Sequence, residues 1–595
     1  MFQMIHDALG HPDDNPFDKD DMSDDINISS NSHKEPKKPS LTHEQFEKLI
    51  KDAEQQLYPG CNGFSKLSFV VNLFQIKCVN GLSNKAFTNI LQLVKKALPE
   101  GNNLPTTYHD SKKIIQDLGL SYEKIDACEN DCMLYWKENE SLETCKVCGL
   151  SRWKVIKNVT KNHKKIPRKV LRYFPLKPRL QRLFMSSDNA TDLRWHSEGR
   201  VKDEILRHPA DSEAWKTLNK IDPTFNSDPR DIRLGLASDG FNPFGQQRSD
   251  YITWPVVLSV YNFPPWMFTK QPYLMLSLLI PGPKAPGNNI DVYLRPLIDE
   301  LKDLWECGIE TYDASKKEYF VMRSALLWTI NDFPAYANLS GWSTKGYMAC
   351  PTCGKGTSSF RLPNCRKICY MDYRCFLPLN HKWRDSKTFD GKVERRPAPK
   401  PLPGDEMLAQ MSGLEDLKFG KDVKHPKRAD NWRKISIFFE LPYWSRLLLR
   451  HNLDVMHIEK NVFDNILGTL LDIRGKSKDH IKARHDLKEL RIRKKLHPKL
   501  INGKWHIPPA MYTLSPGEKD KVCKFLEEVK VPDGYSSIFS KCIKKRKVSG
   551  LKTHDCHVLL QQLLPLAIRG ISCQQVYDLV VELGIFFQGV VFEIT

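Results

Sequence analysis

A chain of 595 residues with 41% hydrophobic content is long enough for roughly two to four folded domains. Its 90 Lys and Arg residues outnumber 71 Asp and Glu residues, and the resulting net charge of +19 suits a polyanionic partner such as nucleic acid. No apolar run reaches the ~18 residues of a membrane helix and the acidic start lacks the pattern of a signal peptide, which predicts an intracellular protein that makes no membrane contact.

The N-terminal part divides by composition. Residues 1–40 are polar and poor in apolar side chains, which predicts a disordered tail. Residues 41–122 contain HEQFEKLIKDAEQQL and NKAFTNILQLVKKAL, where apolar residues recur every three or four positions, so a helical domain is expected.

Four cysteines follow in CENDCMLYWKENESLETCKVC, at Cys128, Cys132, Cys145 and Cys148. In a reducing compartment, clustered cysteines indicate metal ligands rather than disulfides. A Cys-x3-Cys pair and a Cys-x2-Cys pair, twelve residues apart, match the spacing of a tetrahedral structural Zn²⁺ site. We therefore expect a zinc-binding module at residues 123–155, followed by a basic linker at 156–230.

Residues 232–332 carry the most informative order of elements. IRLGLASD, WPVVLSVYNF and PYLMLSLLIPG predict three consecutive strands, and DVYLRPLIDELKDLWECG predicts a helix with Pro296 in its first turn. YFVMRSALLWTIND predicts a fourth long strand ending at Asp332. Three strands, a helix and a strand parallel to the first are the opening order of the ribonuclease H-like fold, an α/β fold with a mixed sheet and flanking helices.

In that fold the first and fourth strands are neighbours, so Asp239 and Asp332, each at the end of one of them, should meet. Adjacent carboxylates repel unless a divalent cation lies between them. Taken singly, Asp239 could be an Asp-Gly turn residue, and Asp332 a cap before Pro334.

A third acid is expected from LDVMHIEKNVFDNILGTLLDI, whose apolar stripe predicts a helix with Glu459 at the edge of the buried face. Asp454 is the rival ligand, although its position suits a helix N-cap, and Glu459 could instead pair with His457 or Lys460. Three carboxylates would hold two Mg²⁺ or Mn²⁺ ions about 3.5–4 Å apart for hydrolysis of a phosphodiester.

A polar insert at residues 340–440 interrupts this expected catalytic domain of residues 231–475. It contains CPTCG, with Cys350 and Cys353, and an exposed Pro-rich linker. A second Zn²⁺ site is expected there with His381 as third ligand. The alternative is that the other cysteines, Cys365, Cys369 and Cys375, pack a small loop.

Two basic runs lie in the region 476–550. RIRKKLHPK is typical of solvated charge that can also contact phosphates, and KKRKV at 544–548 resembles a nuclear import signal. Because of this import signal, the nucleus is the predicted location.

The start of a further helical domain is expected at 551–595.

Several segments together resemble the transposases of plant CACTA elements, the Enhancer/Suppressor-mutator (En/Spm) superfamily. They include CENDCMLYW, RWH at 194–196, RLGLASDGFNPFG, LLWTINDFPAYANLSGWSTKGYMACPTCG, FLPLNHKWR, NLDVMHIEKNV and THDCHVLLQQLLPLAIRG. The similarity runs from about residue 73 to past residue 570.

The resemblance implies a cut-and-paste DNA transposase whose acidic (DDE) triad falls on Asp239, Asp332 and Glu459. It also implies terminal inverted repeats and target DNA as partners, a homo-oligomer that pairs two element ends, and a second element-encoded protein. Where the family reads MGHRRFLP this chain reads MDYRCFLP, so Tyr373 replaces a histidine, and Cys375 lies close enough in the sequence to substitute for it as a ligand.

Relatives of this type continue further, so a truncated copy is expected. Two other functions compete with an active transposase. One is a non-catalytic, domesticated zinc-containing protein, derived from a transposase, that binds DNA and has a regulatory function. The other is a ribonuclease H-like nuclease that cuts branched or hybrid nucleic acid.

Overall fold

The computed structural model describes residues 55–592, with gaps at 118–121, 156–164, 204, 244–250, 422, 424–427, 533–534, 537–538 and 545–546. The expected disordered tail at 1–40 lies outside the described residues, as does part of the expected import signal. Within the described part, no helix has both the length and the apolar character needed to cross a bilayer.

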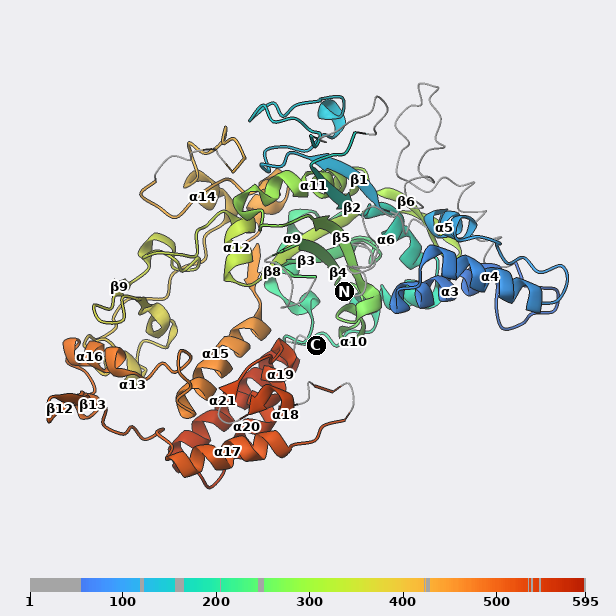
Figure 1. Cartoon of the computed structure of the whole chain (residues 1–595). Coiled ribbons are helices and arrows are strands. Elements are labelled where there is room, and N and C mark those ends of the chain that lie inside the picture. The colour runs from blue at the N-terminus through green and yellow to red at the C-terminus, as the bar shows by residue number, and fades with distance from the viewer. Residues whose placement is uncertain are drawn as a thin grey trace.

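Seven strands of the described residues form one mixed sheet in the middle of the molecule (Figure 1). Their order across the sheet is β1, β2, β5, β4, β3, β8, β11. Their bounds are β1 (Glu123–Ala127), β2 (Lys169–Tyr173), β3 (Ile232–Ser238), β4 (Trp254–Val260), β5 (Leu274–Ile280), β8 (Ser324–Asn331) and β11 (His451–Leu453). The sheet thus begins in the segment expected to be the zinc module and ends beyond the insert.

The strand directions agree with the predicted order. β3, β4 and β5 are successive antiparallel neighbours, whereas β8 runs parallel to β3, with Leu236 opposite Thr329. β11 continues the sheet parallel to β8. The predicted pairing of the first and fourth strands is confirmed. These strands are buried on both faces, which explains their continuous apolar runs.

The helix α11 (Ile290–Glu306) packs on the sheet through eleven buried residues. The prediction that Pro296 lies in its first turn is wrong, since the helix already begins at Ile290. Pro296 has no N–H to donate to the preceding turn, and it lies on the buried face. The predicted long fourth strand is also divided. Its first part is β7 (Glu318–Met322), which forms a hairpin with β6 (Ile309–Asp313).

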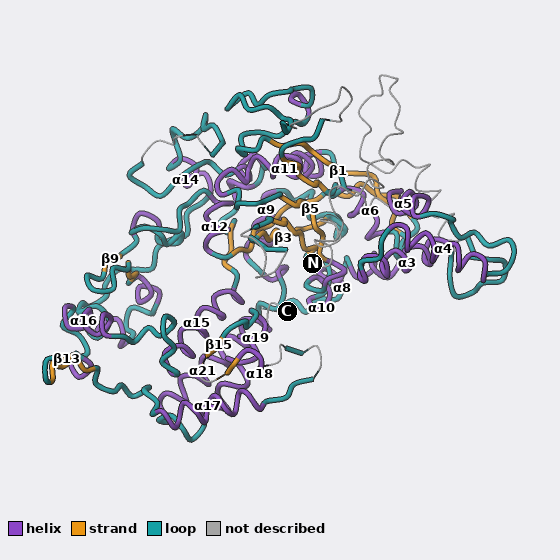
Figure 2. Tube along the Cα trace, in the orientation of Figure 1, coloured by secondary structure: helices purple, strands orange, loops and turns teal. Residues whose placement is uncertain are grey.

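The insert leaves the sheet after β8 and returns at β11, mostly as loops (Figure 2). Its elements are α12 (Phe333–Ser340), β9 (Ser359–Arg361), β10 (Ile368–Tyr370), α13 (Lys382–Asp385) and α14 (Gly404–Ala409). The returning chain is held by the fully buried Lys434, whose Nζ pairs with Asp291 of α11 and donates to the Asn288 carbonyl at 3.0 Å. This ion pair attaches the insert to the core.

Two groups of helices precede β5 in the sequence. The helices α3 (Lys66–Asn80), α4 (Asn84–Ala97) and α5 (Tyr108–Asp117) pack around Phe87 and Leu91, which confirms helical structure in that region. Shorter helices lie between β2 and β5: α6 (Lys177–Phe184), α7 (Ser187–Asp192), α8 (Trp195–Glu198), α9 (Glu213–Ile221) and α10 (Pro265–Phe268).

The C-terminal helices form a second large core (Figure 1). It contains α15 (Val455–Leu470), α17 (Pro516–Glu528), α18 (Phe539–Cys542), α19 (Thr553–Val558), α20 (Leu564–Ile568) and α21 (Gln574–Phe592). Between the insert and this core lie α16 (Ile481–Glu489) and a short hairpin of β12 (Lys499–Ile501) with β13 (Lys504–His506). A second hairpin, β14 (Ile543–Lys544) with β15 (Lys547–Val548), connects α18 to α19 and contributes Ile543 and Val548 to the core. Because α15 starts one residue after β11, it connects this core to the sheet edge.

The core leaves no room for a side chain at Gly235 in β3. A Cβ there would lie 2.0 Å from Tyr261 Oη, which accepts a hydrogen bond from Trp328 Nε1 at 3.1 Å. We expect Gly235→Ala to lower the free energy of unfolding by about 1–3 kcal/mol through overpacking. Chemical denaturation measures this, with Ala237→Ser, at an exposed position of the same strand, as control. An unchanged Gly235→Ala stability would contradict this packing.

Candidate functional site

Three aspartates stand directly after three parallel strands. Asp239 follows β3, Asp332 follows β8 and Asp454 follows β11. Because the carboxyl ends of parallel strands meet at one edge of a sheet, the three side chains share that edge. The sequence placed Asp239 and Asp332 there, with Asp454 as the rival of Glu459.

A buried polar network joins the strand ends beneath the aspartates. Asn331 Oδ1 accepts from the Ser238 N–H at 3.2 Å, and Asn331 Nδ2 donates to Thr329 Oγ1 at 2.9 Å. Thr329 Oγ1 in turn lies 2.8 Å from His451 Nδ1. Burial lowers the pKa of His451 to about 3, so the ring is neutral and fits the network without charge. This network was not found from sequence, although an Asn directly before Asp332 was a signal for it.

Each aspartate uses one oxygen locally. Asp332 Oδ1 accepts from the Ala335 N–H at 2.8 Å and caps α12, and Asp454 Oδ1 accepts from the Met456 N–H at 2.9 Å and caps α15. Asp239 Oδ1 accepts from the Gly240 N–H at 2.6 Å. Within the described residues the three Oδ2 atoms have no such partner, so one oxygen of each group is available to a cation.

The carboxylates influence one another. Partial burial of the Asp239 carboxylate is the largest cause that raises its pKa above the ordinary value, and the charge of Asp332 is the second. Asp454 adds to this shift and His457 opposes it. The side chains are nevertheless not drawn into a tight ligand set: among the described residues, the four cysteines below are the only group of three or more His, Cys, Asp or Glu side chains whose ligand atoms all lie within 4.8 Å of one another.

Glu459 lies in a different environment. It is buried on α15, with Oε2 at 2.9 Å from His557 Nδ1 and Oε1 accepting from Gln561 Nε2 at 3.0 Å. Both partners belong to the C-terminal helices, His557 to α19 and Gln561 to the π-helical turn after it. The carboxylate thus bridges α15 to the C-terminal core, instead of pairing with His457 or Lys460.

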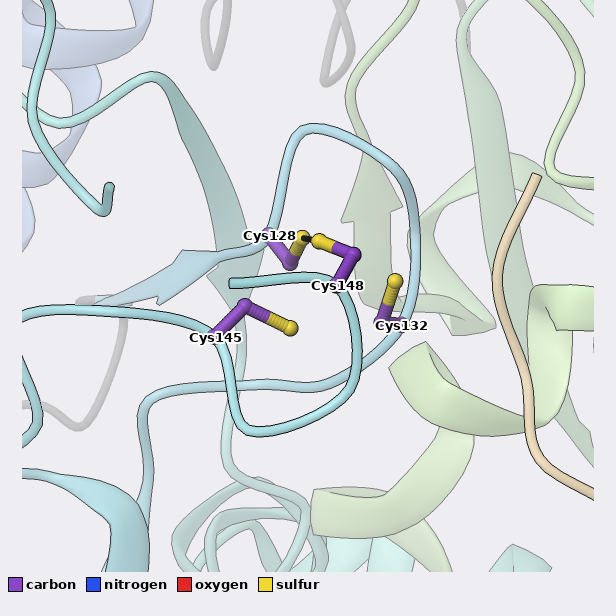
Figure 3. A group of neighbouring side chains, drawn as sticks. All are labelled: Cys128, Cys132, Cys145 and Cys148. Atoms are coloured by element: carbon purple, nitrogen blue, oxygen red, sulfur yellow. Dashed lines mark hydrogen bonds between the residues drawn. The ribbon is translucent and has the colours of Figure 1, made fainter. Parts of the chain in front are cut away.

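Cys128, Cys132, Cys145 and Cys148 converge in a loop next to β1, with their sulfurs pointing toward one another (Figure 3). The Sγ atoms of Cys128 and Cys148 are 3.5 Å apart. Zinc bound at about 2.3 Å from four sulfurs in a tetrahedron separates them by about 3.8 Å. The Val147 N–H donates to Cys145 Sγ at 3.4 Å. The donor set and its spacing fit Zn²⁺.

The electrostatics also favour a cation at this position. Burial raises the pKa of Cys128 to about 12 and raises the pKa of Cys132 still further. Buried thiolates are therefore unfavourable by themselves, and a bound dication would offset their cost.

Asp131, inside the first cysteine pair, attaches the zinc loop to the sheet domain. Its buried carboxylate accepts from Lys169 Nζ of β2 and Tyr293 Oη of α11, and Lys421 Nζ lies 3.3 Å from its other oxygen. Gly420 packs so closely on Cys132 Sγ that a Cβ would lie 2.8 Å from the sulfur. The cysteine module is thus part of the core.

The second cysteine cluster does not assemble in the same way. The pKa of Cys353 is raised by burial and then by Cys350, with Cys375 also acting on it, whereas Cys365 interacts with Asp486 and Cys369. His381 caps α13, its Nδ1 accepting from the Trp383 N–H at 3.2 Å. Of the three cysteines after Cys353 in this cluster, Cys375 is the one whose charge acts on Cys353. The expected zinc set of Cys350, Cys353 and His381 stays a prediction.

The fold and site define a mixed α/β protein with an acidic sheet edge and a cysteine cluster able to hold zinc. Residues 203–414 match the family described as Transposase family tnp2. The match includes Asp239 and Asp332, ends before Asp454, and supports a transposase that binds DNA. A comparison with curated proteins finds no match.

Removing one cysteine of the cluster tests the zinc site. Cys145→Ser should lose one equivalent of zinc relative to the parent chain and melt at a lower temperature, because metal binding contributes folding free energy. Metal analysis and thermal unfolding measure this, with the exposed Cys307→Ser as control. Retention of all zinc by Cys145→Ser would contradict the assignment.

The raised pKa of Asp239 predicts a pH-dependent stability. The protonated form of Asp239 favours the folded chain. Ionisation of Asp239 therefore lowers the free energy of unfolding as pH rises through the raised pKa, and this loss persists at neutral pH. Asp239→Asn should stabilise the metal-free chain at pH 7 by roughly 0.2–1 kcal/mol after solvent screening.

Thermal unfolding as a function of pH measures this gain, which should shrink below the ordinary aspartate pKa. Asp472→Asn, at an exposed position beyond α15, serves as control. A variant less stable than the parent at pH 7 without metal would contradict the proposed repulsion.

Proposed function

We propose that this protein is a cut-and-paste DNA transposase of the CACTA type, with a ribonuclease H-like catalytic core that uses Mg²⁺ or Mn²⁺. The observation that carries the proposal is the convergence of Asp239, Asp332 and Asp454 after three parallel strands of one sheet. The match to a transposase family over residues 203–414, which include β3 and β8, supports the DNA substrate.

The strand order supports the proposed core. β5, β4 and β3 form an antiparallel meander, and β8 and β11 extend it in parallel on the other side of β3. This arrangement puts the end of β8 next to Asp239 and the end of β11 one strand further along the same side of the sheet, where the chemistry of the fold is expected.

The roles of the aspartates follow from the one carboxylate oxygen that each leaves free of local hydrogen bonds. Asp239 and Asp332 would hold the cations, with Glu459 or Asp454 completing the set from α15. When bound, the ions would activate a water or a 3′-hydroxyl and stabilise the leaving oxygen of the phosphodiester. The buried network of Asn331, Thr329 and His451 would keep the strand ends in register while charge accumulates above it.

DNA contacts are proposed for the basic segment after α16. The β12–β13 hairpin exposes Leu500 and Trp505, and basic residues precede it from Arg491 to Lys499. Aromatic and cationic side chains together suit a nucleic acid backbone and its bases. The proposed DNA partners are the terminal inverted repeats of the element and the target DNA. The proposal also includes a homo-oligomer that pairs two element ends, a second element-encoded protein as partner, and the nucleus as location.

Metal-dependent cleavage tests it. The purified chain should nick DNA carrying element ends in Mn²⁺, and Asp239→Asn or Asp332→Asn should reduce the rate by at least about a hundredfold, because each removes a metal ligand. Asp472→Asn should cut like the parent.

Comparing Asp454→Asn with Glu459→Gln in the same assay identifies the third acid. Glu459→Gln can keep a hydrogen bond to the C-terminal helices, so a loss of cleavage at unchanged melting temperature would assign Glu459 to the metal. The same result for Asp454→Asn would assign Asp454. DNA binding without cleavage by the parent chain would favour the non-catalytic regulatory protein, and cleavage without preference for element ends the alternative nuclease.

A further inference from the structure

A polar cavity of about 380 Å³ lies at the other end of β3 from Asp239. Its walls come from α8, α9 and the start of β3, and they include His196 of the RWH segment, to which the catalytic proposal gives no role. Arg233 and Asp239 are six residues apart along an extended chain, which corresponds to about 20 Å. The cavity is therefore separate from the acidic edge.

The cavity walls are rich in positive charge. Arg200, Lys202, Lys216 and Arg233 line it, and no carboxylate does so among the described residues. Arg200 pairs with Asp211, and Lys216 pairs with Glu213 at 2.8 Å in an exposed contact. Within the described part of the chain, Lys202 and Arg233 have no ion-pair partner. The charge of Asp231 favours the Arg233 cation, but Asp231 does not line the cavity, so the side chains of the cavity wall leave both cations without a paired carboxylate.

Arg233 is held rigidly at the base of this site. It is 1% exposed, its Nη2 donates to Asn219 Oδ1 at 2.7 Å, and its guanidinium lies 4.3 Å from the Trp215 ring centroid. Its Nε–H is buried with no hydrogen-bond partner in the described structure. A buried N–H of a guanidinium without an acceptor is costly, so an anionic or strongly accepting ligand would stabilise this group.

Further features suit a phosphate ester. Asn219 and Asn226 direct their amide oxygens to Arg233 Nη2, at 2.7 and 3.4 Å, which leaves their NH₂ groups as donors. Burial lowers the pKa of His196 to about 3, so its ring is a neutral wall at physiological pH. Trp215 adds an aromatic surface, and the volume lies in the range of about 300–1,000 Å³ typical of small-ligand sites.

We propose that this cavity binds the phosphate group of a single nucleotide unit, either a free nucleotide or one unit of a nucleic acid strand. Lys202, Lys216 and Arg233 supply the charge, and the amides of Asn219 and Asn226 supply neutral donors. The site lies away from the acidic edge, so its function is recognition.

Calorimetric titration of the full chain tests the proposal with four probes: inorganic phosphate, deoxyadenosine monophosphate, deoxyadenosine, and a short single-stranded oligonucleotide without terminal phosphates. The monophosphate should bind, phosphate should compete with it, and deoxyadenosine should fail to bind. The double variant Lys202→Gln/Lys216→Gln should weaken binding by about tenfold, as expected for loss of two charged contacts.

Lys220→Gln is the matched control, because Lys220 is exposed on α9 but does not line the cavity. Both substituted lysines are solvent-facing, so circular dichroism and melting temperature should stay unchanged. If the double variant also lowers the salt dependence of oligonucleotide binding by the amount expected for about two phosphate contacts, the phosphate that the cavity binds belongs to a nucleic acid strand. If it affects only the monophosphate, the source is a free nucleotide.

Either pattern supports a phosphate site. The proposal is overturned if the parent binds neither phosphate nor the monophosphate and the double variant binds the oligonucleotide as the parent does. Because none of these measurements uses cleavage, their failure would leave the proposed catalytic function untouched.

Discussion

The parallel pairing of β3 with β8, and of β8 with β11, is the constraint on which the rest of the structure depends. It carries three chain segments, separated by an α-helix, a hairpin and a long insert, to a single sheet edge. There the buried Asn331, Thr329 and His451 connect the strand ends through hydrogen bonds. A polar network of this kind is stable only when its members are satisfied, so it specifies the register that places the aspartates.

The carboxylates oppose this arrangement in the absence of cations. Each uses one oxygen on a local backbone N–H, and burial, followed by the charges of Asp332 and Asp454, raises the pKa of Asp239. The site therefore combines a rigid base with groups that repel one another, as is common where function has a cost in stability. Glu459, in contrast, is satisfied by His557 and Gln561 and links the sheet edge to the C-terminal core.

Much of this architecture could be predicted from the sequence. The apolar runs that end in Asp239 and Asp332 predicted their strands, because strands buried on both faces have a distinctive composition. The order of three strands, a helix and a fourth strand predicted the parallel pairing. The cysteine spacing predicted the cluster at Cys128 because ligand geometry restricts spacing. Local patterns could not predict that Asp131 attaches this cluster to the core, since its partners Lys169 and Tyr293 are distant in sequence. The orientation of Glu459 was hidden for the same reason: its partners lie about a hundred residues further on.

We propose that the aspartates at the sheet edge form a divalent metal site, and calorimetric titration of Mn²⁺ into the zinc-loaded chain tests this proposal. Saturable binding to the parent chain is expected, lost in Asp332→Asn and retained in Asp472→Asn, with all three proteins folded. Equal Mn²⁺ binding by the parent chain and Asp332→Asn, or no binding by the folded parent chain, would contradict it.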